Sequence, residues 1–392
     1  MGPCLPRTLI LADLHLVRDT PKALSHDLAR FVEGHPGARI IVAGDLFDLP
    51  SSLPRMPRND AVAAALGAHP EARRALGDHL DRGGELWLLG GNHDAEMAQA
   101  DFHEALLGAI GPSPEGRRRV RTSPWFFREG GLHVEHGHLY DPDNAPAHPL
   151  VVGRRSLGVH FVEEFVAPAG AQRYLQANDG TPLELFLSSF RWYGPRAPLV
   201  IYRYFRAAFQ AVLRSGPFYT AGSEIALGRE RALAFAEELG LDAGEIERIL
   251  ALGATPTMES LSRTFTRLYF DRVIATVAMS TGLGALAAGK RAPGALILGL
   301  GALLMGASWA AGHDRYRGTV SERLSGSAAA VRGATGASLV VFGHTHREAL
   351  DEGYANTGSF AFPAGAPGRP YLEIEGDAKA PRAVRRYFPA SA

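Results

Sequence analysis

The chain has 392 residues, which is enough for about two or three domains and for one large hydrophobic core. Its 41 Lys and Arg residues balance its 41 Asp and Glu residues, so no net charge attracts nucleic acid and no nucleic-acid partner is expected. Cys4 is the only cysteine, which excludes an intrachain disulfide and a thiolate metal site. The N-terminal residues lack the basic and apolar regions of a signal peptide, so we expect the catalytic part to be cytoplasmic.

The first 140 residues alternate between short apolar runs and helical spacing. Residues 8–12, 39–43 and 85–89 are apolar runs typical of buried strands, whereas residues 24–31 and 61–79 have the apolar periodicity of helices. This rhythm predicts an α/β layered sheet with functional loops at the carboxyl ends of its strands.

The pattern then becomes β, with predicted strands at 123–127 and 131–134, and it returns to β near the C-terminus. There we predict strands at 338–342, 354–360, 371–374 and 383–388, and a structural turn at Asn356-Thr357-Gly358-Ser359. We therefore predict a core in two parts, residues 1–140 and 337–392, that is interrupted by an insertion at residues 141–336.

The insertion is mostly helical in spacing and rich in arginine beside aromatic residues, as in Phe190-Arg191-Trp192-Tyr193. This pattern has two interpretations. The arginines of amphipathic helices either face water, or they form a surface that contacts lipid or phosphate. Sequence spacing does not separate the two.

Within the insertion, residues 273–312 predict an apolar helical hairpin. Residues 292–312 carry no charge and are long enough to span a bilayer, and residues 273–289 are marginal. Rows of small residues would let the two helices pack closely; the rows are Ser280/Gly284/Ala288 and Ala302/Gly306/Ala310.

This hairpin has two interpretations, a membrane-inserted pair and a soluble pair that is buried or pairs with another copy in a homo-oligomer. A membrane pair would cross twice and keep both parts of the core in one compartment. Lys290 and Arg291 would then lie on the far side, against the positive-inside tendency, while other arginines flank the near side as that tendency prefers; these are Arg263, Arg267, Arg272, Arg315 and Arg317.

Five polar clusters follow the apolar runs of the core. They are Asp13-Leu14-His15, Gly44-Asp45-Leu46-Phe47-Asp48, Gly90-Gly91-Asn92-His93-Asp94, His136-Gly137-His138 and Gly343-His344-Thr345-His346. Carboxylate and amide oxygens mixed with imidazoles suit Mn, Fe or Zn better than Ca, and a shared carboxylate is the usual bridge of a two-metal phosphoester site. Asp45 is the natural bridge.

At these residues the sequence resembles the calcineurin-like metallophosphoesterase superfamily, whose blocks run D-x-H, GD-x-x-D, GNH-D/E, H and GH-x-H. The resemblance covers residues 8–140 and 339–360 and implies a β-sandwich flanked by helices, with two divalent metal ions. It implies that one ion is held by Asp13, His15, Asp45 and His346, and the other by Asp45, Asn92, His136 and His344.

The resemblance also implies that His93 protonates the leaving oxygen and that Asp48 orients His93. A carboxylate hydrogen-bonded to an imidazole fixes its tautomer and raises its pKa, which fits such a role. His138 either contacts the substrate or hydrogen-bonds to the ligands, and Asp94 has the position of a local cap.

Within the superfamily, the blocks at residues 10–16, 44–47 and 343–347 resemble the family of UDP-2,3-diacylglucosamine hydrolases, which also carry a helical insertion. His93 stands where those enzymes commonly have arginine, and this insertion is far longer. Asp48 and the following Leu49-Pro50 disfavour purple acid phosphatases and Ser/Thr protein phosphatases.

We therefore expect a metal-dependent phosphoester hydrolase, with Mn as the favoured metal, that acts on an amphipathic substrate at the cytoplasmic side of the inner membrane. Two alternatives stay open. The first is a phosphoesterase for soluble substrates that the hairpin only anchors, and the second is a membrane scaffold that keeps the fold without the chemistry.

Overall fold

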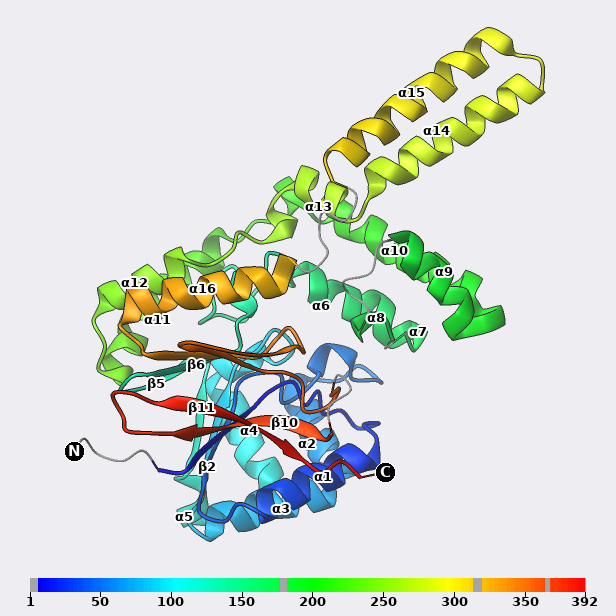
Figure 1. The fold of residues 1–392 in the computed structure, drawn as a ribbon. Helices are drawn as coiled ribbons and strands as arrows, with labels where there is room; N and C mark the ends of the chain where they lie inside the picture. The colour runs from blue at the N-terminus through cyan, green and yellow to red at the C-terminus, as the bar shows by residue number, and fades with distance from the viewer. Residues whose placement is uncertain (1–5, 172, 177–181, 313–318, 364–366, 392) are drawn as a thin grey trace. The chain divides into compact units, whose positions relative to one another are not determined.

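The computed structural model describes residues 6–171, 173–176, 182–312, 319–363 and 367–391 (Figure 1). Two compact units divide the chain. The first comprises Met1–Glu163, Ala221–Pro256 and Ser321–Ala392, and the second comprises Glu164–Thr220 and Thr257–Val320. The insertion boundaries predicted after residues 140 and 336 stay a prediction.

The first unit contains a six-stranded sheet in the order β11-β10-β1-β2-β3-β4. The first four strands of the chain run parallel, and the last two join antiparallel beside β1. The strands are β1 (Thr8–Leu11), β2 (Arg39–Val42), β3 (Glu85–Leu89), β4 (Val120–Ser123), β10 (Arg369–Glu375) and β11 (Arg382–Phe388).

A second, five-stranded sheet has the order β5-β6-β7-β9-β8. Strands β6, β7 and β9 are parallel, and an antiparallel strand lies at each edge. Its strands are β5 (Phe126–Glu129), β6 (Leu132–Glu135), β7 (Leu339–Phe342), β8 (Glu348–Asp351) and β9 (Tyr354–Thr357).

Alternation along the strands builds two hydrophobic layers, one on each face of the six-stranded sheet. In β1, Leu9 and Leu11 point to one layer and Ile10 to the other, because successive side chains of a strand point to opposite faces. The layer that contains Ile10 also contains Val134 and Val341 of the second sheet, so it fills the space between the sheets. The predicted α/β sandwich is therefore confirmed.

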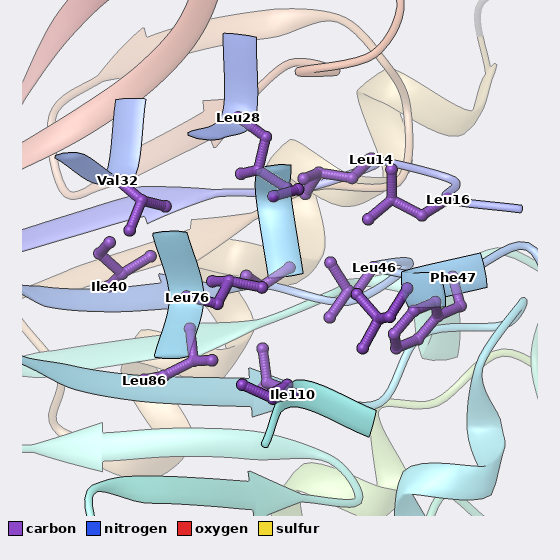
Figure 2. Close-up of a cluster of buried hydrophobic side chains, with 14 of the residues drawn as sticks. Leu14, Leu16, Leu28, Val32, Ile40, Leu46, Phe47, Leu76, Leu86 and Ile110 are labelled. Carbon is purple, nitrogen blue, oxygen red and sulfur yellow. The ribbon is translucent and has the colours of Figure 1, made fainter. Parts of the chain in front are cut away.

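The other layer lies between the six-stranded sheet and the helices that follow its strands. Figure 2 shows Leu28 and Val32 of α1, Leu76 of α3 and Ile110 of α4 lying over strand residues such as Ile40. The helices on this side are α1 (Lys22–Glu33), α2 (Arg58–Ala68), α3 (Pro70–Asp81), α4 (Ala100–Ile110) and α5 (Pro114–Arg117).

A second group of helices covers the outer face of the five-stranded sheet (Figure 1). The ring of Phe235 in α11 contacts those of Trp125 and Phe126, and Thr335 at the end of α16 accepts a hydrogen bond from Arg128 of β5. The group consists of α11 (Gly222–Leu239), α12 (Ala243–Ala251) and α16 (Thr319–Thr335). The order of layers is helix, sheet, sheet, helix.

Several elements differ from those predicted; the strand expected at 354–360, for example, ends at Thr357. The helix expected at 61–79 is two helices, because Pro70 lacks the N–H that would continue α2. The strand expected at 123–127 is interrupted at Pro124, which separates β4 from β5. The edge strand β8 was not predicted, since its sequence Glu-Ala-Leu-Asp lacks the β-branched and aromatic residues typical of strands.

The second unit is helical in its described residues. It contains α7 (Ala167–Ala169), α8 (Arg173–Gln176), α9 (Pro182–Tyr193), α10 (Ala197–Leu213), α13 (Leu261–Arg267), α14 (Phe270–Ala287) and α15 (Arg291–Ala310). The predicted large helical insertion is thus confirmed as a helical middle region. Arg315 and Arg317, expected to flank the hairpin, lie outside the described residues.

Helices α14 and α15 lie side by side as the expected hairpin (Figure 1), but the predicted small-residue rows do not form its contact. Ser280/Gly284/Ala288 and Ala302/Gly306/Ala310 are exposed. The buried positions are Ala275 and Gly282 in α14 and Gly294, Gly301 and Ser308 in α15. They recur every seven residues, because the contact line of two helices that cross at a small angle repeats every 3.5 residues rather than every four.

Candidate metal centre

The predicted site residues lie in loops that follow five strands of the first unit. Asp13 and His15 follow β1; Asp45 and Asp48 follow β2; Asn92, His93 and Asp94 follow β3; His136 and His138 follow β6; His344 and His346 follow β7. Because β1, β2 and β3 are parallel neighbours, and β6 and β7 are too, the carboxyl ends of each set meet at one sheet edge. The fold thereby brings the five sequence clusters together.

Several of the predicted ligands have a positive backbone φ angle, which is rare for residues other than glycine elsewhere in the described chain. Among described residues other than glycine, six have positive φ, namely Asp13, His15, Asp45, Tyr269, His344 and His346. Five of these six were predicted as metal ligands. Such conformations cost about 1–2 kcal/mol per residue for side chains with a Cβ, and they concentrate at functional sites.

Asp13, His15 and His346 form one group in which a ligand atom of each residue lies close enough to hold an ion. The Nε2 atoms of His15 and His346 are 3.2 Å apart, and Oδ1 of Asp13 lies 3.2 Å from Nε2 of His346. Asp13 is fully buried, yet its Oδ1 atom accepts no hydrogen bond. An unsatisfied buried carboxylate oxygen that faces two imidazoles fits a cation between them.

Asp45 joins two further groups of this kind, one with His15 and His93 and one with Asp13 and His136. Its Oδ2 atom lies 3.3 Å from Nε2 of His136 and 3.9 Å from Nε2 of His15. The three groups overlap, so Asp45 has the position expected of a carboxylate shared by two ions.

Asn92 and His344 complete the predicted second ligand set around His136. The side-chain Oδ1 atom of Asn92 is 3.0 Å from Nε2 of His136, and the rings of His136 and His344 have centroids 5.1 Å apart. The amide N–H of His344 also donates to Oδ2 of Asp13 at 3.1 Å. All seven predicted metal ligands therefore lie in one connected cluster.

His93 is buried beside this cluster and is paired with Asp48. Its Nδ1 atom lies 2.7 Å from Oδ1 of Asp48, and its Nε2 atom lies 4.0 Å from Oδ2 of Asp45. Burial alone would lower the pKa of His93, but the carboxylates of Asp48 and Asp45 outweigh it and raise this pKa to about 10. The two carboxylates therefore favour the imidazolium form of His93.

Two other histidines of the centre have opposite tendencies. Burial opposes the charge of His136, yet Asp45 raises its pKa to about 9. Burial and the neighbouring charge of His93 lower the pKa of His15 to about 4. A neutral His15 has the lone pair that a metal ligand needs.

Asp94 connects two loops and is not the predicted local cap, because its side chain makes no capping hydrogen bond to the helical turn that follows it. Its carboxylate accepts hydrogen bonds from the backbone N–H groups of Gly91, Asp45 and Phe47. Burial and the charge of Asp45 raise its pKa to about 7. Asp94 thus fixes the backbone that carries Asp45.

Two glycines leave the space that the ligands occupy. A Cβ atom at Gly91 would lie 2.1 Å from Oδ1 of Asp45, and one at Gly44 would lie 2.5 Å from the ring of His136. Gly44 also has a φ of +87°, which side chains rarely adopt. Glycine is required at both positions by the close approach of ligand side chains.

Sequence reasoning missed Asp141 and Asn144, which support two of the predicted ligands. Oδ2 of Asp141 lies 2.9 Å from Nε2 of His344, and Nδ2 of Asn144 donates to the same oxygen at 2.7 Å. Nδ2 of Asn92 donates in turn to Oδ1 of Asn144 at 3.2 Å. This hydrogen bond orients the side chain of Asn92 so that its own Oδ1 atom faces the cluster. No sequence pattern marks Asp141, because its partner His344 lies 203 positions away in the chain.

The carboxylate of Asp141 is ionised at neutral pH. Burial would raise its pKa, but the hydrogen bond and charge of His344 lower it to about 2. A carboxylate that accepts from one nitrogen of a ligating imidazole leaves the other nitrogen for a metal ion.

His138 lies against the rings of His136 and His344, with centroid distances of 5.3 Å and 6.4 Å. It is buried, its Nδ1 atom makes no hydrogen bond, and burial lowers its pKa well below the usual value. Asn356, where a turn was predicted, lies in strand β9 instead, and its Nδ2 atom supports the last cluster by donating to the carbonyl of Gly343 at 2.7 Å.

No protein-family model matches the chain, and a search of curated proteins also found no match. The geometry of the cluster therefore carries the functional argument. Its donor set of buried carboxylates, imidazoles and one amide fits a divalent cation of the Mn, Fe or Zn type.

Proposed function

We propose that the protein is a metal-dependent phosphoester hydrolase of the calcineurin-like metallophosphoesterase type. The observation that supports this most strongly is the overlap of three ligand groups through Asp13, His15 and Asp45, with strained backbone at five of the predicted ligands. A single structural ion needs one ligand group, whereas overlapping groups around a shared carboxylate suit two ions.

In this proposal two divalent ions, Mn or else Fe or Zn, occupy the cluster. Asp13, His15, Asp45 and His346 hold one ion, and Asp45, Asn92, His136 and His344 hold the other. When bound, such a pair supplies a water of lowered pKa and neutralises the oxygens of the phosphoryl group. Asp141 and Asn144 orient the imidazole of His344 and the amide of Asn92.

His93 is the proposed general acid. Its Nδ1 atom is held by Asp48, so Nε2 is the nitrogen that donates a proton to the leaving oxygen. The pKa of about 10 keeps that proton in place, and nearby metal ions would lower this pKa toward the range in which transfer is efficient. Asp48 stabilises the imidazolium before transfer.

The proposed substrate is an amphipathic phosphoester or pyrophosphate at a membrane surface, such as a UDP-diacylglucosamine-like lipid. Large apolar side chains that are exposed on the second unit support a lipid-associated substrate. The proposed location is the cytoplasmic side of the inner membrane.

The test combines metal content with turnover. We expect about two Mn ions per chain and Mn-dependent hydrolysis of a generic phosphodiester. Asp45→Ala should lose at least one ion and lower kcat/KM by about a thousandfold or more, since shared ions supply several kcal/mol of transition-state stabilisation. Asp60→Ala, at an exposed position on α2, is the matched control. Full activity of Asp45→Ala would overturn the proposal.

The substrate class is tested separately by comparing a UDP-diacylglucosamine lipid in mixed micelles with the soluble diester. A much higher kcat/KM for the lipid supports the proposed substrate. If only the soluble diester is hydrolysed, the protein is still a hydrolase, but the lipid substrate is wrong. If the metal-loaded protein hydrolyses neither compound, a non-catalytic scaffold is favoured.

A further inference from the structure

We propose that the α14–α15 hairpin spans a lipid bilayer, with Lys290 and Arg291 at the surface opposite to the metal centre. This goes beyond the proposed hydrolase and does not depend on it. Among the described residues, one helix is long and apolar enough to cross a membrane, and it is α15. The packing of the hairpin, the charges at its ends and its length all support the crossing.

The hairpin is arranged differently from a soluble helix pair, because all its buried positions are small residues and many of its large apolar side chains are exposed. A Cβ atom at Gly282 would lie 2.5 Å from the backbone of Leu298, and one at Gly301 would lie 2.8 Å from that of Met279. Such close backbone approach through small residues is typical of helices packed in lipid.

Several large apolar side chains of the hairpin are exposed rather than packed against the partner helix. On α15, Leu296, Leu300 and Leu303 are 63%, 57% and 71% exposed, and on α14 Val277 is 60% exposed. Soluble proteins rarely leave a contiguous apolar surface of this kind in water. Because the hairpin's own partner helix does not cover these residues, a bilayer is the environment that we infer for them.

Charges stand only at the two ends of the hairpin. Lys290 and Arg291 form the tip, and residues 292–310 of α15 carry no charge. At the base, the guanidinium of Arg272 lies 4.7 Å from the ring centroid of Tyr269 and 5.8 Å from that of Trp309, and it donates to the carbonyl of Gly312. Aromatic rings beside a cation are typical of the membrane–water interface.

The length between the two charged ends matches a bilayer. The 20 residues of α15 extend about 30 Å at 1.5 Å per residue, which is about the thickness of the hydrocarbon core. Helix α14 is 18 residues long, and Asp271 and Arg272 stand in its first turn. Since α14 packs along α15, it returns through the same bilayer, and both parts of the core stay on one side.

Labelling from each side of a vesicle tests the crossing. In a Cys4→Ser background of the full chain, Lys290→Cys marks the tip and Ser262→Cys, at an exposed position of α13, marks the base. The protein is added to preformed phosphatidylethanolamine and phosphatidylglycerol vesicles that either contain or are surrounded by a membrane-impermeant maleimide. We expect the tip to react only with the trapped reagent and the base only with the external one.

Two other outcomes would each overturn the proposal. A tip that reacts from outside would mean that the hairpin stays in water or pairs with another copy. A tip that reacts from neither side would mean that it dips into the bilayer without crossing.

A charge substitution gives a second test that does not need a cysteine. Leu303→Glu places a charge in the middle of the proposed span, whereas Leu233→Glu changes a leucine of α11 that is 65% exposed. We expect the Leu303 variant to shift mostly from the vesicle pellet to the supernatant and the Leu233 variant to stay in the pellet. Equal pelleting of the two variants would also contradict the proposal.

Discussion

The metal centre and the α14–α15 hairpin use glycine for opposite purposes. At the centre, Gly44 and Gly91 leave space for polar side chains from other loops, such as His136 and Asp45. In the hairpin, Gly282 and Gly301 leave space for the backbone of a facing helix. The first region keeps charged groups buried and its apolar residues inside, whereas the second turns its large apolar residues outward. Glycine content alone therefore does not identify a region, since what approaches the glycine decides its role.

Among the variants that test this comparison, Gly91→Ala has the largest expected effect, and it tests the first half. The new methyl group would overlap Oδ1 of Asp45, 2.1 Å away, and its backbone nitrogen, 2.6 Å away, so the shared carboxylate must move. A displacement near 1 Å costs about a hundredfold in rate, and we expect kcat/KM for a phosphodiester to fall at least that far.

The control for this variant is Gly108→Ala, because a Cβ atom at Gly108 in α4 meets nothing within 4 Å. It should retain full activity and gain a little helix stability. If Gly91→Ala kept the activity of the control, the ligand set built around Asp45 would be wrong.

Asn144→Ala tests whether the residues that sequence reasoning missed hold the ligands in place. The variant removes the hydrogen bond that orients the amide of Asn92 and one of the three donors to the carboxylate of Asp141. Loss of such a supporting partner typically costs about 10–100-fold in metal affinity. Calorimetric titration with Mn checks this, with Asn59→Ala as the matched control, because the side chain of Asn59 donates to Asp101 on the surface. Unchanged affinity would restrict Asn144 to a structural role.

Asp141 and Asn144 show where sequence reasoning reaches its limit. Asp13, His15 and His344 were found because short spacing places them after apolar runs, and the runs at residues 85–89 and 339–342 are strands as expected. A residue that supports a ligand carries no such pattern, because its partner comes from a distant segment. Asp141 and its partner His344 are separated by 203 positions.

The hairpin shows a second limit, which concerns register. The sequence predicts two helices packed through small residues four apart, but the observed contact uses small residues seven apart. Gly284 and Gly306 have open space around them, whereas Gly294 faces Leu286 and Gly301 faces Met279. The relative position of the two helices determines which small residues lie in their contact. That position depends on packing along the whole length of the hairpin.

Asp48→Asn tests the proposed proton donor through the pH dependence of turnover. Since Asp48 raises the pKa of His93, its loss should lower that pKa by about one to three units. A general acid must hold its proton, so activity is present below this pKa and lost above it. The basic limb of the pH–rate profile should therefore move to lower pH. An unmoved limb in Asp48→Asn, with Asp60→Asn as the control, would contradict the role of the pair.

Gly301→Leu tests the second half of the comparison and carries the smallest expected effect. The side chain would enter the contact with Met279 and Ala275, where the nearest atoms are 2.8 Å and 3.1 Å from the new Cβ. Overpacking of this kind costs about 1–3 kcal/mol, which we expect as faster hydrogen exchange of α14 and α15 in mixed micelles. Gly306→Leu is the matched control five residues away, because its side chain would point into open space. If both variants exchanged at the same rate, the seven-residue contact line would be wrong; if Gly306→Leu alone were faster, the row predicted from the sequence would be the true one.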